Sequence, residues 1–170
     1  VIIHELVHVM GIYNMHLTLD FATNTESYKI SESVCECLAC IISPLYDTFN
    51  LDQICDIIDL ELDFSFLQIA KILYYAGFSN IRDFFNNKSK KKISQSTTMI
   101  EYYIIKTMLL YKLDDFLNII LNGTDQAQIV DVVKHIIQEC VRNEKFLNKI
   151  EKKINKVKSK VYDDYMMKTA

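Results

Sequence analysis

The residues with the clearest chemical potential lie at the start of the sequence, where His4, Glu5 and His8 form the pattern His-Glu-x-x-His. On a helix, His4 and His8 are four residues apart and project from one face, so both imidazoles can bind one metal ion. Glu5 lies beside them and can hold a water molecule on that ion and take its proton. The spacing therefore predicts a Zn²⁺ site with Glu5 as general base.

The side chains around this motif are almost all apolar, from Val1 to Ile3 and again at Leu6, Val7, Val9 and Met10. A helix that is apolar all round is expected to be buried. Buried imidazoles and carboxylates need partners, because an unpaired buried charge is very costly. A metal ion would partner all three residues. The alternative is an ordinary helix with two surface histidines.

A second helix is expected from Ser31 to Ile42, with Glu32 and Glu36 four residues apart on one face. Glu32 can supply the third metal ligand, and the fourth position of a tetrahedral catalytic zinc remains for water. Glu36 can accept the outer N–H of a ligand histidine and fix its tautomer. The alternative is a capped, solvated first turn, in which Ser31 caps the helix and both glutamates favour its N-terminus.

These two helices resemble the gluzincin branch of the zincin metallopeptidases, in which an HExxH helix is followed by a helix with Glu-x-x-x-Asp/Glu. The resemblance covers residues 1–44. It implies a zinc-dependent peptidase that hydrolyses peptide bonds through a zinc-activated water. It also implies His4, His8 and Glu32 as zinc ligands, Glu5 as catalytic base and Glu36 as the support of a ligand histidine.

Two related resemblances stay open. Metzincins extend the motif to HExxHxxGxxH, and Gly11 fits, but Asn14 occupies the third histidine position and His16 comes two residues late. Other zincins have a second helix that runs Glu-x-x-Ala-x-x-Phe-Ala and closes at a proline. The segment from Glu32 to Pro44 is similar in outline, and it again makes Glu32 the ligand.

A peptidase also needs a hydrogen-bond donor for the tetrahedral oxyanion. In gluzincins this is usually a Tyr, His or Arg from the downstream helices. Tyr102 and Tyr103 are the preferred candidates, because their hydroxyls need partners in an otherwise aliphatic helix. The other candidates are Tyr74, Tyr75 and His135, and each tyrosine can instead be a core aromatic.

The composition favours a mainly α-helical, multi-helix bundle, because the 170 residues include only 3 Gly and 1 Pro. Zincins place a β-sheet before the HExxH helix, and none is expected here. The chain is therefore expected to be the C-terminal part of a longer protein, with any N-terminal targeting signal out of sight. No apolar run approaches the roughly 20 residues of a membrane span. The 5 cysteines make no disulfide framework, which favours an intracellular, reducing compartment.

The periodicity and capping signals predict helices over residues 1–12, 31–44, 50–62, 65–77, 98–113, 114–121 and 125–140. Capping boxes at Ser65–Gln68 and Thr98–Glu101 mark the starts of two of them. A further short helix is expected after Ser79, which would cap it. A loop is expected from Tyr13 to Tyr28 and an exposed lysine-rich linker over residues 86–94. Cys35, Cys37 and Cys40 are expected to be small buried side chains, not metal ligands.

The charge distribution suggests three parts: the active-site helices at 1–44, a helical subdomain at 45–140 and a basic amphipathic helix at 141–170. Residues 1–87 carry 3 basic and 12 acidic side chains, a charge that would repel the phosphates of a nucleic acid, so the lysine-rich linker is not expected to bind one. Residues 141–170 carry 9 basic and 4 acidic side chains. This segment is expected to pack back on the acidic body, with a partner protein, an anionic membrane or a nucleic acid as alternatives.

The other function class is a degenerate zincin that serves as a non-catalytic helical interaction module or a structural zinc protein.

Overall fold

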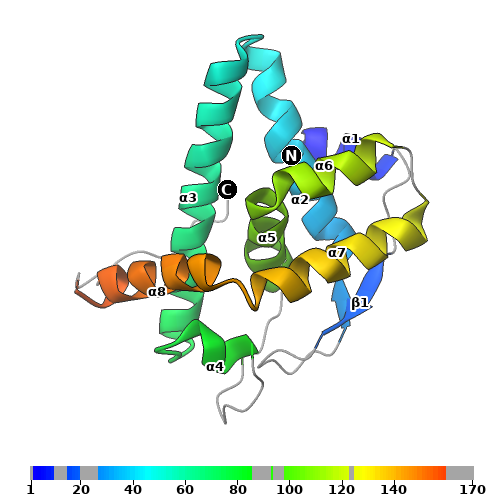
Figure 1. The fold of residues 1–170 in the computed structure, drawn as a ribbon. Helices are drawn as coiled ribbons and strands as arrows, with labels where there is room; N and C mark the ends of the chain where they lie inside the picture. The colour runs from blue at the N-terminus through cyan, green and yellow to red at the C-terminus, as the bar shows by residue number, and fades with distance from the viewer. Residues whose placement is uncertain are drawn as a thin grey trace.

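The computed structural model describes residues 2–9, 15–19, 27–85, 93, 98–122 and 125–159, and these are mainly helical with one two-stranded sheet (Figure 1). Its elements, in chain order, are α1 (Ile2–Val9), β1 (His16–Thr18), β2 (Ser27–Lys29), α2 (Ile30–Asp47), α3 (Leu51–Tyr75), α4 (Ile81–Phe85), the π-helix η1 (Ile100–Ile105), α5 (Lys106–Tyr111), α6 (Leu113–Leu121), α7 (Gln126–Cys140) and α8 (Glu144–Ser159). The predicted linker at 86–94 lies outside the described residues except for Ile93. No helix within the described ranges is both long enough and apolar enough to cross a membrane.

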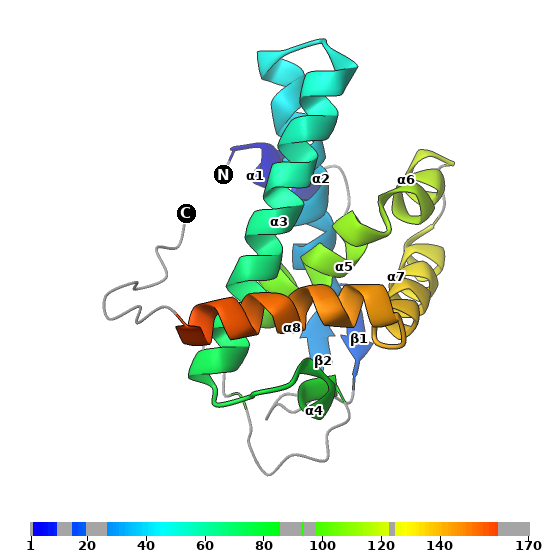
Figure 2. The same ribbon diagram turned by 60° about the vertical axis from the view of Figure 1, so that its left-hand side comes forward.

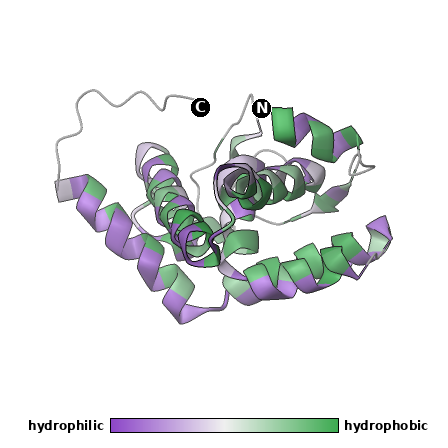
Figure 3. Ribbon diagram, turned by 90° about the horizontal axis from the view of Figure 1, so that it is seen from above, coloured by the Kyte–Doolittle hydropathy of each residue, from purple (hydrophilic) through white to green (hydrophobic). Residues whose placement is uncertain are grey.

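Helix α1 corrects the expectation of a buried helix. Val7 is its one buried residue, whereas the side chains of Ile2, Leu6 and Val9 are 77%, 51% and 83% exposed. The apolar residues on all sides of α1 therefore do not indicate that it is buried. The helix packs on α2 through one face. Figure 3 shows the hydrophobic ribbon of α1 beside the N-terminus.

The segment between α1 and α2 was predicted to be a loop, but it contains two short strands. Strands β1 and β2 pair in antiparallel fashion, with Leu17 opposite Tyr28. Both of these side chains are buried. Three-residue strands offer too short an alternation to stand out in a sequence. The hairpin matters because β2 leads directly into α2.

Helix α2 differs from the prediction at both ends. Pro44 was expected to stop it, yet the helix continues to Asp47 with Pro44 in its last turns. Ser31 does not cap it, because this residue is fully buried inside the first turn and its backbone N–H lies 3.4 Å from the Met15 carbonyl oxygen. Pro44 has no N–H to donate to the carbonyl of residue 40, and the helix ends three residues later, at Asp47.

Helix α3 is one long helix instead of the two that were predicted. Asn50 caps it as expected, with Oδ1 accepting from the backbone N–H groups of Asp52 and Gln53. Ser65 is buried in mid-helix and donates to Glu61 at 3.2 Å, so it starts no capping box. Gly77 ends the segment at φ 80°, the left-handed conformation that the sequence predicted.

Two other predicted caps are replaced by different contacts. Asn80, not Ser79, accepts the backbone N–H of Arg82 at the start of α4. The Thr98–Glu101 segment opens the π-helix η1 instead of a capped α-helix, and Glu101 is buried. Glu101 accepts the backbone N–H of Lys29 at 3.3 Å, so a tertiary contact takes the side chain that the local pattern assigned to capping.

The basic C-terminal helix packs on the acidic body, as expected. Helix α8 crosses the lower part of α3 in Figures 1 and 2, and Lys153 Nζ lies 2.6 Å from Asp63 of α3. Its predicted apolar face is buried throughout: Phe146, Leu147, Ile150, Ile154 and Val157. Phe146 packs against Phe66 and Tyr111, with ring centroids 5.3 and 5.0 Å away. The charge complementarity read in the sequence is therefore satisfied within the chain, and residues 160–170 lie outside the described part.

Candidate metal centre

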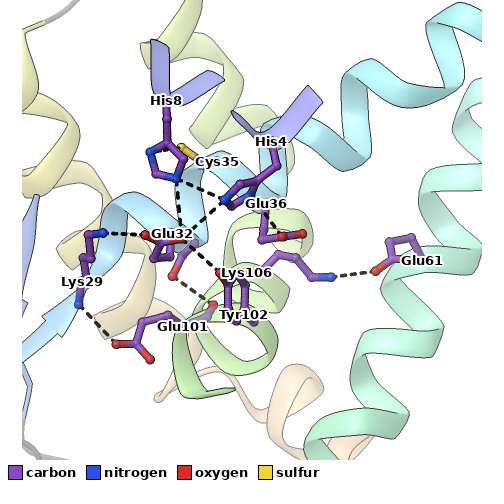
Figure 4. A network of polar contacts seen from close by, with 11 residues as sticks. His4, His8, Lys29, Glu32, Cys35, Glu36, Glu61, Glu101, Tyr102 and Lys106 are labelled. Carbon is purple, nitrogen blue, oxygen red and sulfur yellow. Dashed lines mark hydrogen bonds and ion pairs between the residues drawn. The ribbon is translucent and has the colours of Figure 1, made fainter. Parts of the chain in front are cut away.

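Helices α1 and α2 bring His4, His8 and Glu32 to one point (Figure 4). The Nε2 atoms of the two histidines lie 3.1 Å apart. Oε2 of Glu32 lies 3.4 Å from the Nε2 atom of His4 and 3.6 Å from that of His8. All three side chains are largely covered, with exposed fractions of 12%, 20% and 11%. The residues predicted as metal ligands thus converge, although α1 itself is mostly exposed.

The triangle formed by these three atoms has the dimensions of a tetrahedral zinc site. Donor atoms bound at roughly 2.0–2.1 Å to a tetrahedral ion are separated by about 3.3 Å. The three observed separations run from 3.1 to 3.6 Å. Two imidazoles and one carboxylate are also a donor set that suits zinc in catalytic sites. The residues present therefore fit such an ion.

The outer nitrogen of each histidine faces a neighbouring residue of α2. Nδ1 of His4 is buried and lies 3.1 Å from Glu36 Oε1, although the angle is not that of a regular hydrogen bond. Nδ1 of His8 lies 3.4 Å from the sulfur of Cys35. Burial, with the charges of Glu32 and Glu36, raises the pKa of the Cys35 thiol to about 12. The outer nitrogen of His4 thus faces a carboxylate, and that of His8 faces a thiol.

Glu32 has two further partners, which fix the orientation of its carboxylate. Lys29 Nζ lies 2.7 Å from Oε1, and the Tyr102 hydroxyl donates to Oε2 at 3.1 Å. Burial of Glu32 favours the neutral form. Its hydrogen bonds to Lys29 and Tyr102, together with the Lys29 charge, outweigh burial and hold the pKa of Glu32 below its ordinary value. The carboxylate is therefore ionised at neutral pH, as a metal ligand must be.

The two preferred tyrosines have different surroundings. Tyr102 points into the site, and its ring centroid lies 6.3 Å from that of His4. Burial and the charge of Glu32 raise the pKa of Tyr102, which keeps its hydroxyl a donor. Tyr103, one residue on, packs against the core, and its ring lies 5.9 Å from Lys106 Nζ. Of this pair, only Tyr102 reaches the group of His4, His8 and Glu32.

The other candidate donors lie elsewhere. Tyr74 and Tyr75 make an edge-to-face contact at the end of α3, with ring centroids 5.5 Å apart. His135 is 70% exposed on α7 and pairs with Glu139. His16, the late histidine of the metzincin alternative, is exposed on β1 and is not part of the His4, His8 and Glu32 group. The predicted base, Glu5, is exposed on α1, and its charge contributes to the raised pKa of Cys35.

Three residues around the site were not predicted to belong to it: Lys29, Cys35 and Glu101. Lys29 is three residues before Glu32, a spacing that could have signalled an ion pair. Glu101 had no such signal, because it is 72 residues from Lys29 in the sequence. The carbonyl of Glu101 also accepts the hydroxyl of Ser33 at 3.0 Å, which ties η1 to the first turn of α2.

A cleft of about 350 Å³ opens beside the contact between His4 and Glu36. It runs between α2 and α3 and reaches Pro44 and Asp47 on one helix and Ile57 and Glu61 on the other. The candidate metal centre is therefore next to a space that is open to solvent.

Comparison with protein-family models, with curated proteins and with solved structures finds no match.

Proposed function

We propose that this protein is a zinc-dependent peptidase of the gluzincin type, with His4, His8 and Glu32 as the zinc ligands. The observation that carries the proposal is the triangle of donor atoms, whose edges of 3.1, 3.4 and 3.6 Å suit a tetrahedral ion. Two residues from one helix and a third from the next make this set, in the order that the two motifs predict.

The residues around the ligands have roles that follow from their positions. Zinc, when bound, supplies a Lewis acid and lowers the pKa of water. Glu5 takes the water proton and passes it to the leaving amine, since it follows His4 directly and is exposed to solvent. Glu36 and Cys35 face the outer nitrogens of the histidines, and their role is to orient the two rings. Tyr102, whose hydroxyl already reaches Glu32, donates to the oxyanion.

A structural zinc site is the second candidate, and one observation favours it. Helix α1 buries only Val7, so few apolar contacts hold it on α2. An ion shared between His4, His8 and Glu32 would tie the two helices together, and such binding energy contributes directly to folding. In that case Glu5 has no chemical task.

Zinc content and hydrolysis of a fluorogenic peptide library separate these possibilities. The purified protein should contain one zinc by elemental analysis, and His8→Ala should lose it. Glu5→Gln should keep the zinc and lose hydrolysis by at least about a hundredfold. Asp131→Asn, an exposed change on α7, is the matched control and should keep both. Full hydrolysis by Glu5→Gln contradicts the catalytic role, zinc binding without hydrolysis favours the structural site, and a wild type without zinc rejects both.

A further inference from the structure

The hairpin of α2 and α3 carries an unusual concentration of exposed apolar side chains. It extends beyond the other described elements at the top of Figures 1 and 2. Between residues 45 and 64 of this hairpin, the exposed large hydrophobic residues are Leu45, Tyr46, Phe49, Leu51, Ile57, Leu60 and Phe64. A concentration of exposed hydrophobic side chains on one projecting element is typical of an interaction surface.

On α3 three of these residues form a continuous line. Ile57, Leu60 and Phe64 follow the i, i+3, i+7 spacing that places side chains on one helix face, and they are 40%, 71% and 47% exposed. They lie on the side of the helix opposite Phe66, which is buried. This line, called the α3 stripe below, has the spacing with which one amphipathic helix contacts another.

The surroundings of the stripe are acidic. Residues 30–70 contain 8 Asp and Glu and no Lys, Arg or His. Asp52, Asp56 and Asp59 are exposed on α3, and none of them is in an ion pair with another residue of the described ranges. A surface that combines apolar and acidic rows is complementary to a helix with apolar and basic rows.

The protein already contains one such contact. Helix α8 is basic and amphipathic, and it packs on the lower part of α3 with its apolar side buried and Lys153 paired with Asp63. Asp63 continues the acidic row of Asp52, Asp56 and Asp59 at helical spacing. No described element covers the upper part of this acidic row, at Asp52, Asp56 and Asp59.

The stripe is continuous with the cleft beside the metal centre, because Ile57 belongs to both. The polar lining of that cleft includes Glu36, Asp47 and Glu61, so its charge has the same sign as that of the stripe. A segment bound along the stripe would therefore reach the neighbourhood of His4.

We propose that the upper face of the α2–α3 hairpin binds a basic amphipathic helix of a partner protein. The acidic row would repel an anionic lipid surface. It would also repel the same face of a second copy of this chain. If the metal centre cleaves peptides, the partner is its substrate. Only this identification of the partner depends on the proposed function.

Binding to a designed probe tests the inference. The probe is a fluorescein-labelled helical peptide of leucine and lysine, with leucines three and four residues apart, and anisotropy is followed in EDTA so that zinc plays no part. The double variant Leu60→Ser/Phe64→Ser should weaken binding at least about tenfold. Asp56→Lys/Asp59→Lys should do the same and reduce the salt dependence. Leu121→Ser and Asp131→Lys change an exposed leucine and an exposed aspartate elsewhere and should leave affinity within about twofold.

Several results would overturn the inference. These are no binding of the probe, equal binding by the stripe variants, or equal binding of a peptide with glutamate in place of lysine. Sedimentation that shows a dimer lost in Leu60→Ser/Phe64→Ser would assign the face to a second copy instead. Adsorption to zwitterionic vesicles that is lost in the same variant would assign it to a lipid surface. Circular dichroism of each variant verifies that the fold is retained.

Discussion

The ammonium group of Lys29 lies 2.7 Å from Oε1 of Glu32, so one oxygen of this carboxylate is held by the residue that precedes its helix. The other oxygen, Oε2, is the one that faces both imidazoles. The pair thus decides which oxygen of Glu32 is presented to a metal ion. Neither HExxH nor ExxxE includes Lys29, although its i, i+3 spacing from Glu32 makes the contact a local one.

Replacement of Lys29 should change the acid stability of the metal-free protein. The pKa of Glu32 is below its ordinary value in the folded state, so the pair stabilises the fold above the unfolded pKa of about 4.3. That stabilisation is lost as the pH falls through the lower folded pKa. Lys29→Met should therefore lower the free energy of unfolding by about 0.2–1 kcal/mol near neutral pH, since the lysine is partly exposed.

Urea unfolding in EDTA over a pH series measures this difference, which should shrink below about pH 4. Lys134→Met removes an exposed lysine of α7 and is the control that should show no such trend. A Lys29→Met effect that is equal at all pH values would show that the ion pair is not its cause.

Glu32 and Glu36 should differ in their effect on zinc affinity. Glu32→Ala removes a ligand and should abolish tight binding, whereas Glu36→Ala removes a support of His4 and should weaken binding by about 10–100-fold. Competition against a chromophoric chelator measures both. If the two substitutions exchange their effects, the assignment of ligand and support is reversed.

The neighbouring tyrosines provide a matched pair for the oxyanion. Tyr102→Phe should lower kcat by about 10²–10³-fold and change zinc affinity by less than about tenfold, because the hydroxyl reaches Glu32 without being a ligand. Tyr103→Phe should leave kcat unchanged, since Tyr103 packs toward the core. Steady-state kinetics on a cleaved library peptide checks both. Equal losses in the two variants would point to a general effect on η1.

Lys106 and Glu61 form an ion pair in which the lysine is buried, with 2.7 Å between their charged atoms. Burial of Lys106 lowers its pKa. Its electrostatic interactions with Cys40 and Glu61 outweigh burial, so the pKa of Lys106 is raised. Glu61→Ala should destabilise the fold by about 1–3 kcal/mol, because it leaves this cation uncompensated. Lys106→Met should cost less or be stabilising, since it replaces the buried charge by an apolar chain.

Thermal unfolding ranks these two variants directly. Lys158→Met, an exposed change near the end of α8, is the control for loss of a lysine charge. If Lys106→Met is the more damaging of the two, the lysine contributes through contacts other than Glu61.

Helix positions with strong local signals could be predicted from the sequence. The caps at Asn50 and Asp125, the stop at Gly77 and the apolar face of α8 are all present in the structure. The predicted helix stop at Pro44 and the predicted caps at Ser65 and Thr98–Glu101 were wrong, because tertiary packing outweighed the local preferences of these residues. The burial of α1 was wrong for a related reason: apolar composition shows what a helix can bury, not what covers it.

The sequence alone determined which residues have the chemistry of a metal site, because His4, His8, Glu32 and Glu36 stand at helical spacings that depend only on local geometry. Only the tertiary structure decided that the two helices meet with those atoms 3.1–3.6 Å apart. It also placed Tyr102, and not Tyr103, against Glu32 and brought Cys35 to the outer nitrogen of His8. The physical reason is that a helix fixes directions within a few residues, whereas convergence between helices depends on how their buried faces pack.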